Sequence, residues 1–268
     1  MHEKPLNPLA DRTRVCLVTG AARRLGRQIA LTMAQSGWDV VVHFNQSSEQ
    51  AQGVVAEIKR LGRNAAAIGA DLDAEDQIHG LFNEAKMQLG PLTCIVNSAS
   101  RFEFDDAASV SPKGIHAHMQ SNLLAPLLLT QLLYNELKDQ HRPGHDPLGV
   151  VIHLLDQKLF NPNPDFFSYT LSKAALHESV RLCAMAMAPV LRVVGVAPGL
   201  TLPSGDQTAA EFAQTHAMTP LGASSRADEV ADAVAWLATA RAVTGTTLLV
   251  DGGQHLQAQA RDVMMLIR

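Results

Sequence analysis

A tyrosine and a lysine with the spacing Tyr-x-x-x-Lys are residues that can do chemistry together. Tyr169 and Lys173 lie in a stretch with a helical pattern, and the i, i+4 spacing places both on one helical face. A phenol with a pKa of about 10 exchanges protons poorly at neutral pH, but a neighbouring ammonium group stabilises its phenolate. The pair therefore predicts a general acid that protonates a substrate accepting a hydride.

A glycine loop follows the first predicted strand. Thr19-Gly20-Ala21-Ala22-Arg23-Arg24-Leu25-Gly26 leads directly into a predicted helix. Gly20 permits a tight turn, and Gly26 lets the helix approach the sheet closely. The helix N-terminus then presents backbone N–H groups and the positive end of its dipole to a pyrophosphate. A glycine loop between a strand and a helix predicts a dinucleotide site.

The residues after the second predicted strand select the nucleotide. An NAD site needs a carboxylate there for the ribose hydroxyls, and none occurs before Glu49. His43, Ser47 and Ser48 offer donors instead, and Arg23 can reach from the glycine loop, so we predict NADP(H). Alternatively, Arg23 is only a solvated loop side chain. The other candidate cofactor contacts are Phe44, Asn45, Asp71, Leu72, Asn97, Ser98, Ala99 and Ser100.

Alternating segments of two kinds position these residues. Apolar runs rich in β-branched residues lack polar alternation, as strands covered on both faces do, and predict strands at 15–19, 39–44, 65–70, 93–97, 150–155, 193–197 and 246–250. Helical patterns occupy 25–36, 47–61, 74–89, 116–138, 169–188 and 227–240. This succession predicts an α/β fold, a doubly wound parallel sheet with helices on both faces. No linker divides the chain, so we expect one domain over 1–268, with 1–13 as a loose lead-in.

Three further segments break the regular pattern. Residues 101–113 and 200–226 leave the carboxyl ends of strands, where open α/β sheets bind ligands. We expect the second to cover the substrate, with a short helix near 209–216; an ordinary long surface loop is the alternative. The C-terminal extension, 254–268, ends in an apolar cluster at 263–267, which we expect to pack across a subunit interface.

Composition excludes several classes of protein. With 268 residues, 47% hydrophobic and 18% charged, the chain is not of the disordered class. A net charge of −4 gives no electrostatic footprint for nucleic acid. No apolar run reaches the roughly 18 residues of a membrane span, and no secretory signal is evident. The three cysteines lack CxxC spacing and predict buried thiols in a reducing, cytoplasmic location. The histidine spacing predicts no metal site.

Together these motifs resemble the short-chain dehydrogenase/reductase family. The resemblance rests on the glycine loop, Tyr169, Lys173, Asn122, Pro198-Gly199 and Val250-Asp251-Gly252-Gly253, and it covers residues 14–253. It implies a Rossmann-type sheet in the order 3-2-1-4-5-6-7, NAD(P)-dependent hydride transfer and a homotetramer. It also implies that Asn122 holds a water of the proton relay and that Lys173 binds the nicotinamide ribose. Pro198, Gly199 and Leu200 join the candidate cofactor contacts.

Three departures from the family pattern belong together. Arg24 stands where the family has glycine, Asn97-Ser98-Ala99-Ser100 replaces Asn-Asn-Ala-Gly, and Asp156 occupies the position of the catalytic serine. With Phe102, these changes are similar to the pteridine reductase branch, which includes dihydromonapterin and dihydrobiopterin reductases. That likeness implies that Arg24 reaches the cofactor phosphates and the pterin. It implies that Ser100 hydrogen-bonds phosphate or pterin and that Phe102 stacks on the pterin. A basic residue that this branch sometimes carries after the second strand is Gln46 here.

Asp156 suits a pterin or folate-like substrate. Hydride addition to a ring C=N carbon, C6 of a dihydropterin or C7 of an oxidised pterin, leaves a nitrogen that needs a proton. A carboxyl group can share that proton with Tyr169, or as carboxylate accept N–H bonds from the heterocycle. We therefore predict an NADPH-dependent enzyme with Asp156, Tyr169, Lys173 and Asn122 as catalytic residues, and Leu200 as a further substrate contact. The alternatives are a carbonyl reductase for ketones or 3-oxoacyl thioesters, and a silent NADP(H)-binding redox sensor.

Overall fold

Seven strands form one parallel sheet in the computed structural model, which describes residues 14–203 and 207–266. They are β1 (Val15–Val18), β2 (Asp39–Phe44), β3 (Ala65–Gly69), β4 (Cys94–Asn97), β5 (Gly149–Leu154), β6 (Leu191–Pro198) and β7 (Thr247–Val250). Their order is β3-β2-β1-β4-β5-β6-β7, which confirms the predicted single-domain topology. The strand order reverses between β1 and β4, and such a switch point opens a crevice at the carboxyl ends of the strands. The predicted lead-in, 1–13, lies outside the described residues.

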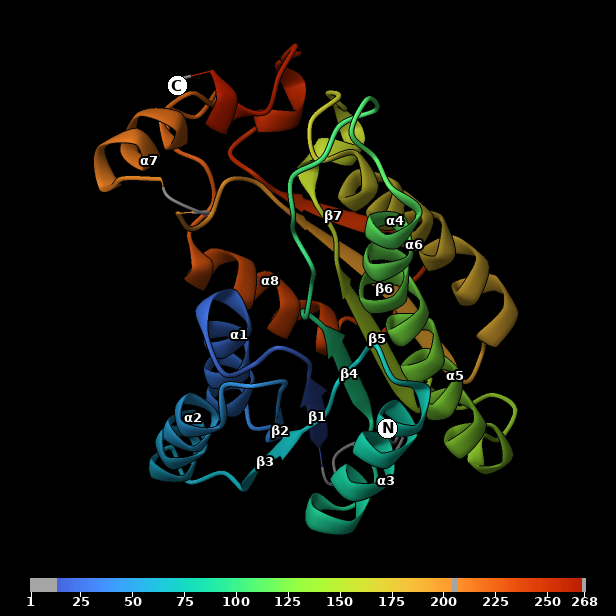
Figure 1. Ribbon diagram of the computed structural model, residues 1–268. Helices are drawn as coiled ribbons and strands as arrows, with labels where there is room; N and C mark the ends of the chain where they lie inside the picture. The colour runs from blue at the N-terminus through green and yellow to red at the C-terminus, as the bar shows by residue number, and fades with distance from the viewer. Residues whose placement is uncertain (1–13, 204–206, 267–268) are drawn as a thin grey trace, which may run out of the picture.

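Helices cover both faces of the sheet, as Figure 1 shows. One face carries α1 (Arg24–Gln35), α2 (Ser48–Arg60) and α8 (Ala227–Thr239). The other carries α3 (Glu75–Leu89), α5 (Ala125–Leu137) and α6 (Phe167–Met187), with α4 (Pro112–Met119) packed against α6. The short helix predicted near 209–216 is α7 (Ala209–His216), beyond the carboxyl ends of the strands at the upper left of Figure 1.

The strands are buried on both sides, which is why their sequences lack polar alternation. In β1, Cys16 and Val18 face the core under α1, whereas Val15 and Leu17 face the core under α3 and α5. All four side chains are completely buried. Continuous apolar strands of this kind confine the polar side chains of the motifs to the strand ends.

The helix predicted at 116–138 is wrong in its start and its continuity. The helical segment begins at Pro112, where the Ser111 side chain accepts the Gly114 N–H as an N-cap. It is interrupted by a π-helical turn, η1 (Gln120–Leu124), before α5 continues to the 3₁₀ turn η2 (Lys138–Gln140). Hydrophobic periodicity does not reveal a single π turn, and such turns are frequent at functional sites.

Three short 3₁₀ turns complete the described elements: η3 (Gln157–Phe160), η4 (Gln254–Leu256) and η5 (Val263–Met265). No described helix is both long and apolar enough to cross a membrane. Within residues 14–203 and 207–266, no group of three or more His, Cys, Asp or Glu side chains is placed to hold a metal ion. The cysteines carry free thiols; Cys16 and Cys94 are buried, and Cys183 is partly buried. The homotetramer stays a prediction.

Candidate active site

A cavity of about 640 Å³ lies at the carboxyl ends of β1, β4, β5 and β6. Its lining brings together most of the predicted site residues: Gly20, Arg23, Arg24, Leu25, Gly26, Ser98, Ala99, Ser100, Phe102, Asp156, Tyr169, Lys173, Pro198, Gly199 and Leu200. The predicted residues outside its lining are His43, Phe44, Asn45, Ser47, Asp71, Leu72, Asn97 and Asn122. A cavity of this size is ample for a small heterocycle together with part of a dinucleotide.

Asp156 and Tyr169 are hydrogen-bonded to each other on the cavity wall. The Tyr169 hydroxyl donates to Asp156 Oδ2 at 2.8 Å, and the Lys158 backbone N–H donates to Asp156 Oδ1 at 2.8 Å. Both carboxylate oxygens are thereby fixed in direction. Helix α6 begins at Phe167, so Tyr169 lies in its first turn, where its side chain lines the cavity.

Lys173 lies one helical turn beyond Tyr169, on the same face of α6. Its ammonium group donates to the Leu154 carbonyl at 2.7 Å and lies 5.8 Å from the centroid of the Tyr169 ring. Burial lowers the pKa of Lys173 to about 8, against the opposing attraction of Asp156. A buried ammonium anchored to a strand-end carbonyl is well placed to hold a ribose hydroxyl.

The pKa of the Tyr169 phenol is shifted upward, although the sequence suggested that Lys173 would stabilise the phenolate. Burial, followed by the charge and the hydrogen bond of Asp156, raises the pKa of Tyr169 well above its ordinary value. Stabilisation of the phenolate by Lys173 is therefore not the dominant effect. Burial also raises the pKa of Asp156, although its hydrogen bonds with Lys158 and Tyr169 act in the opposite direction. Both groups therefore hold a proton more strongly than in water, which keeps a proton in the site but makes each group a weaker acid.

The glycine loop fits a pyrophosphate. Gly20 has φ +65°, and a Cβ there would meet Ala99 Cα at 2.9 Å. A Cβ on Gly26 would meet the Gly20 carbonyl oxygen at 2.3 Å. The loop can thus wrap closely around the N-terminus of α1 only with glycine at both positions. Its N–H groups and helix dipole supply the donors that a diphosphate requires.

His43 is not the phosphate donor that the sequence suggested. Its side chain is 2% exposed; Nδ1 accepts the Gly20 N–H at 3.1 Å, and Nε2 lies 3.0 Å from the Ala70 carbonyl. Burial lowers its pKa to about 4, so the ring is neutral near pH 7. With both nitrogens engaged inside the protein, His43 supports the glycine loop from below.

Arg23 and Ser47 remain as a candidate site for a 2′-phosphate. The Arg23 guanidinium, which is exposed, donates to the Ser47 hydroxyl across the gap between the glycine loop and the start of α2. The neighbouring Asn45 is exposed, whereas Phe44 is partly buried against the core. A guanidinium beside a hydroxyl, with no carboxylate between β2 and Ser48, suits a phosphate better than a free ribose diol.

The floor of the cavity is tied to β1. The Thr19 hydroxyl accepts the N–H groups of Ser98 and Ala99, both at 3.0 Å. Asn97, one residue earlier, is 2% exposed, and its amide nitrogen lies 3.1 Å from Nδ1 of the buried His153. Asn97 is therefore a buried residue beneath the site. After β3, the Asp71 N–H is donated to Gln77, and Leu72 packs in the core.

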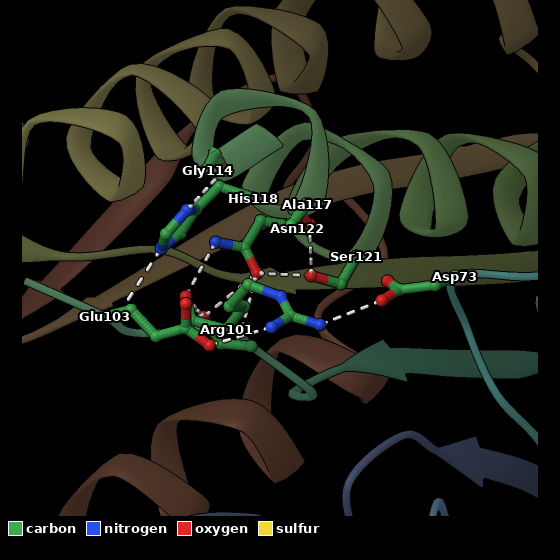
Figure 2. A network of polar contacts seen from close by, with 9 residues as sticks. Asp73, Arg101, Glu103, Gly114, Ala117, His118, Ser121 and Asn122 are labelled. Atoms are coloured by element: carbon green, nitrogen blue, oxygen red, sulfur yellow. Dashed lines mark hydrogen bonds and ion pairs between the residues drawn. The ribbon is translucent and has the colours of Figure 1, made fainter. Parts of the chain in front are cut away.

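Asn122 sits in the π turn and clamps the segment after β4, as Figure 2 shows. Its Oδ1 accepts the Arg101 N–H at 2.7 Å and the Ser100 hydroxyl at 3.3 Å. Its Nδ2 donates to the Arg101 carbonyl and to the Ser172 hydroxyl, both at 3.0 Å. The carboxamide is fully buried and fully bonded within the protein. In this geometry Asn122 positions Ser100, and its role in a water relay stays a prediction.

Aromatic side chains form one wall of the cavity. Phe102 stacks on Phe166 with ring centroids 4.2 Å apart and meets Tyr169 edge to face at 4.7 Å. Phe166 was not expected from the sequence. It adopts φ +53° at the N-terminus of α6, a left-handed conformation that is uncommon outside glycine. Phe102 is 41% exposed and can offer apolar surface to a flat ligand.

Arg24 and the segment after β6 form another wall of the cavity. Arg24 has φ +53°, and its guanidinium donates to the Pro203 carbonyl at 2.7 Å. The Leu200 N–H is donated to Gln254 Oε1 at 3.0 Å, which fixes the start of that segment. Arg24 thus links the glycine loop to the segment predicted to cover the substrate.

The lining also includes residues that sequence reasoning missed. They include Lys158, Asp262 and Val263, the last two from the C-terminal extension, whereas Phe166 packs behind Phe102 and does not line the cavity. Val263 is 6% exposed within its own subunit. Val263 is therefore buried by its own subunit, and the packing of the apolar cluster across a subunit interface stays a prediction. No local sequence signal marks these residues, since the tail reaches the site only through the tertiary fold.

Comparisons with known proteins agree with this geometry. The family model described as Enoyl-(Acyl carrier protein) reductase matches residues 20–255. An uncharacterized oxidoreductase of Methylorubrum extorquens is 33% identical over 248 residues, covering 90% of this chain and 97% of the relative. The 3-oxoacyl-[acyl-carrier-protein] reductase FabG of Staphylococcus aureus is 29% identical over 260 residues, covering 91% and 99% of the two chains.

Two solved structures share this fold, and their sequences are more similar to this chain than that of FabG is. The FolM alternative dihydrofolate reductase 1 of Brucella canis, complexed with NADP, aligns with a TM-score of 0.84 and 34% identity over 93% of this chain and 96% of that one. The FolM of Brucella suis, also complexed with NADP, aligns with the same score and identity over 92% of this chain. The family model spans most of the sequence, including the glycine loop, Asp156, Tyr169 and Lys173. The chain therefore belongs to the short-chain dehydrogenase/reductase family of NAD(P)-dependent oxidoreductases.

Proposed function

We propose that the protein is an NADPH-dependent pteridine reductase that reduces a dihydropterin or dihydrofolate-like substrate to its tetrahydro form. The observation that carries the proposal is the hydrogen bond from the Tyr169 hydroxyl to Asp156 Oδ2, in a cavity with an aromatic wall. A serine in place of Asp156 would suit a carbonyl oxygen, whereas a carboxyl group can exchange a proton with a ring nitrogen. The FolM structures, complexed with NADP, support this substrate class and this cofactor.

The residues of the site fit NADPH. The glycine loop and the N-terminus of α1 would hold the pyrophosphate, Arg23 and Ser47 the 2′-phosphate, and Lys173 the nicotinamide ribose. When bound, NADPH supplies the hydride. Asp156 and Tyr169 hold the proton that the product nitrogen requires, and Phe102 supplies apolar surface for the heterocycle. Arg24 and Leu200 close the cavity above it.

A carbonyl reductase is the second candidate, and the FabG relatives favour it. The acceptor would then be a ketone or a 3-oxoacyl thioester, with Asp156 orienting the Tyr169 hydroxyl. The third candidate, a silent NADP(H)-binding sensor, has no chemical need for the intact Tyr169–Asp156 pair and Lys173.

Oxidation of NADPH, followed by absorbance, separates these candidates. The assay compares a dihydropterin, dihydrofolate, a simple ketone and a 3-oxoacyl thioester, each with NADPH and with NADH. Turnover of the pterin or folate with NADPH is the expected result. Turnover of the ketone or thioester alone would replace the proposal with the second candidate. NADPH binding without any turnover would support the third.

A further inference from the structure

The C-terminal extension forms part of the catalytic cavity. Residues 261–263, which we call the strap, run along the cavity, and Asp262 and Val263 belong to its lining. The strap follows β7 and η4, and Figure 1 shows this C-terminal segment at the upper end of the molecule, beyond the carboxyl ends of the strands. Its path therefore brings an acidic side chain to the catalytic residues from the end of the chain.

Asp165 anchors the strap to the body of the protein. Its side chain is 2% exposed, and both carboxylate oxygens accept Nε–H of Arg261 at 2.9 Å. Its Oδ2 also accepts the Asp262 N–H at 2.7 Å. A buried carboxylate with a guanidinium and a backbone donor is a strong, directional attachment. The anchor fixes the position of Asp262 in the cavity wall.

Asp262 pairs with a buried lysine beside the catalytic aspartate. The Lys158 side chain is 4% exposed; its ammonium lies 3.6 Å from Asp262 Oδ2 and donates to the Asp165 carbonyl. The same ammonium lies 5.4 Å from the centroid of the Phe166 ring. The backbone of Lys158 donates to Asp156 Oδ1. A buried cation is thus held two residues from Asp156 and is compensated by a carboxylate from the strap.

Four charged or titratable groups act on Asp156. Tyr169 and Lys173 face it from α6, Lys158 from η3 and Asp262 from the strap. Burial is the largest cause of the raised pKa of Asp156; among the charged neighbours, Asp262 raises this pKa and Lys158 lowers it. If Asp262 were neutral, the Lys158 ammonium would act uncompensated and would favour the carboxylate form of Asp156.

We propose that the strap is a working part of the active site and that Asp262 is a positioning residue, which pairs with Lys158 and so keeps a proton available on the Asp156–Tyr169 pair. The inference rests on the proposed function in one respect: the proposed function names the substrate that receives this proton. The strap thereby links the C-terminal segment to proton delivery.

The test follows the Asp156 carboxyl group directly, without cofactor or substrate. Full-length protein labelled with ¹³Cγ-aspartate is titrated by NMR, and the Asp156 resonance is identified by its loss in Asp156→Asn. In Asp262→Asn the pKa of Asp156 should fall by about half a unit to one unit. In Lys158→Met it should rise by a similar amount, and in the double variant it should return close to the unmodified value. An Asp156 pKa that does not move in Asp262→Asn would overturn the inference.

Two further variants separate this electrostatic role from a loss of structure. Arg261→Ala removes an exposed partner of Asp165, so it should loosen the strap and shift the pKa of Asp156 in the same direction as Asp262→Asn. Asp139→Asn, an exposed position in η2, is the matched control and should shift nothing. Shifts of the same sign in Asp262→Asn and Lys158→Met would mean a general disturbance and would contradict the proposal.

The outcome is independent of the proposed function. If pterins are not reduced but the titration behaves as expected, the function is wrong and the strap inference holds. If pterins are reduced and the Asp156 pKa is unmoved in Asp262→Asn, the function holds and the inference is wrong. Where turnover is present, the pH limb of kcat/KM that reports Asp156 should move with the NMR value in each variant.

Discussion

The Tyr169 hydroxyl and the Asp156 carboxylate are 2.8 Å apart, with the hydroxyl as donor, and Asp156 takes a second bond from the Lys158 backbone. Asp156 is the N-cap of η3 and Tyr169 lies in α6, so their contact depends on the packing of those two elements. Burial raises the pKa of both groups; their mutual hydrogen bond raises the pKa of Tyr169 further but acts in the opposite direction on Asp156.

Replacement of Tyr169 by phenylalanine should remove the proton donor. We expect kcat to fall by about 10²- to 10⁴-fold, the usual contribution of a positioned general acid. NADPH binding, measured by fluorescence titration, should persist because Lys173 and the glycine loop are unchanged. Tyr134→Phe is the matched control, since Tyr134 lies on α5 outside the cavity lining. Normal turnover in Tyr169→Phe would contradict the proposed role.

Replacement of Asp156 by asparagine should cost activity but not stability. The raised pKa of Asp156 means that this carboxyl stabilises the fold below its unfolded pKa and that the contribution is lost as pH rises through its folded pKa. As pH rises above the pKa of Asp156 in the unfolded chain, its ionisation favours unfolding, a cost that asparagine avoids. We expect an equal or higher Tm together with a loss of turnover of about 100-fold or more. A clearly lower Tm near neutral pH would show that the hydrogen bonds of Asp156 outweigh its desolvation.

The Arg23 side chain should select NADPH over NADH. Arg23→Ala removes the guanidinium beside Ser47, and we expect the KM for NADPH to rise roughly 10- to 100-fold, the range of a charge-assisted hydrogen bond. The KM for NADH should change little. Arg27→Ala, one turn further along α1 and paired with Glu57, is the control. Equal effects on both cofactors would place the 2′-phosphate elsewhere.

The apolar surface of Phe102 should bind the heterocycle. Phe102→Ala is expected to raise the KM for a dihydropterin by roughly tenfold, as one aromatic contact is lost. Phe104→Ala provides a close control, because Phe104 also packs against Phe166 and is exposed but does not line the cavity. Equal kinetics of the two variants would exclude Phe102 from the substrate site.

Two buried histidines should make the fold acid-sensitive. The pKa of His43 is lowered to about 4 and that of His153 to about 3, in both cases mainly by burial. Protonation therefore favours the unfolded chain, so the stability they confer is complete above pH 6.5 and is lost as pH falls toward these values. For His43 alone the loss amounts to about 3 kcal/mol.

Urea unfolding at about pH 7.5 and about pH 5 measures this loss. His43→Gln should show a smaller difference in the free energy of unfolding between the two conditions than the unmodified protein. His79→Gln, at an exposed position on α3, should leave that difference unchanged. An unchanged pH dependence in His43→Gln would mean that other groups cause the acid sensitivity.

The sequence by itself determined the fold class, the sheet order through its family resemblance, and most of the cavity lining. Runs of β-branched residues, glycines at the first strand–helix turn and the i, i+4 spacing of Tyr169 and Lys173 are local features, and local backbone physics is enough to interpret them. The positions of Asp156 and Phe102 followed from the same motifs. The π turn at Asn122 escaped prediction because a segment of 5 residues is too short to show a hydrophobic period of its own.

Only the tertiary structure decided the environment of those residues. His43 appeared to be a phosphate donor until the packing of the glycine loop placed both ring nitrogens inside the protein. Phe102 packs directly against both Phe166 and Tyr169, and the strap reaches Asp165 across 96 residues of sequence. Burial and charge at a site are sums over neighbours contributed by several distant segments. They therefore arise only when the whole chain has folded, and with them the proton affinities of Asp156, Tyr169 and Lys173.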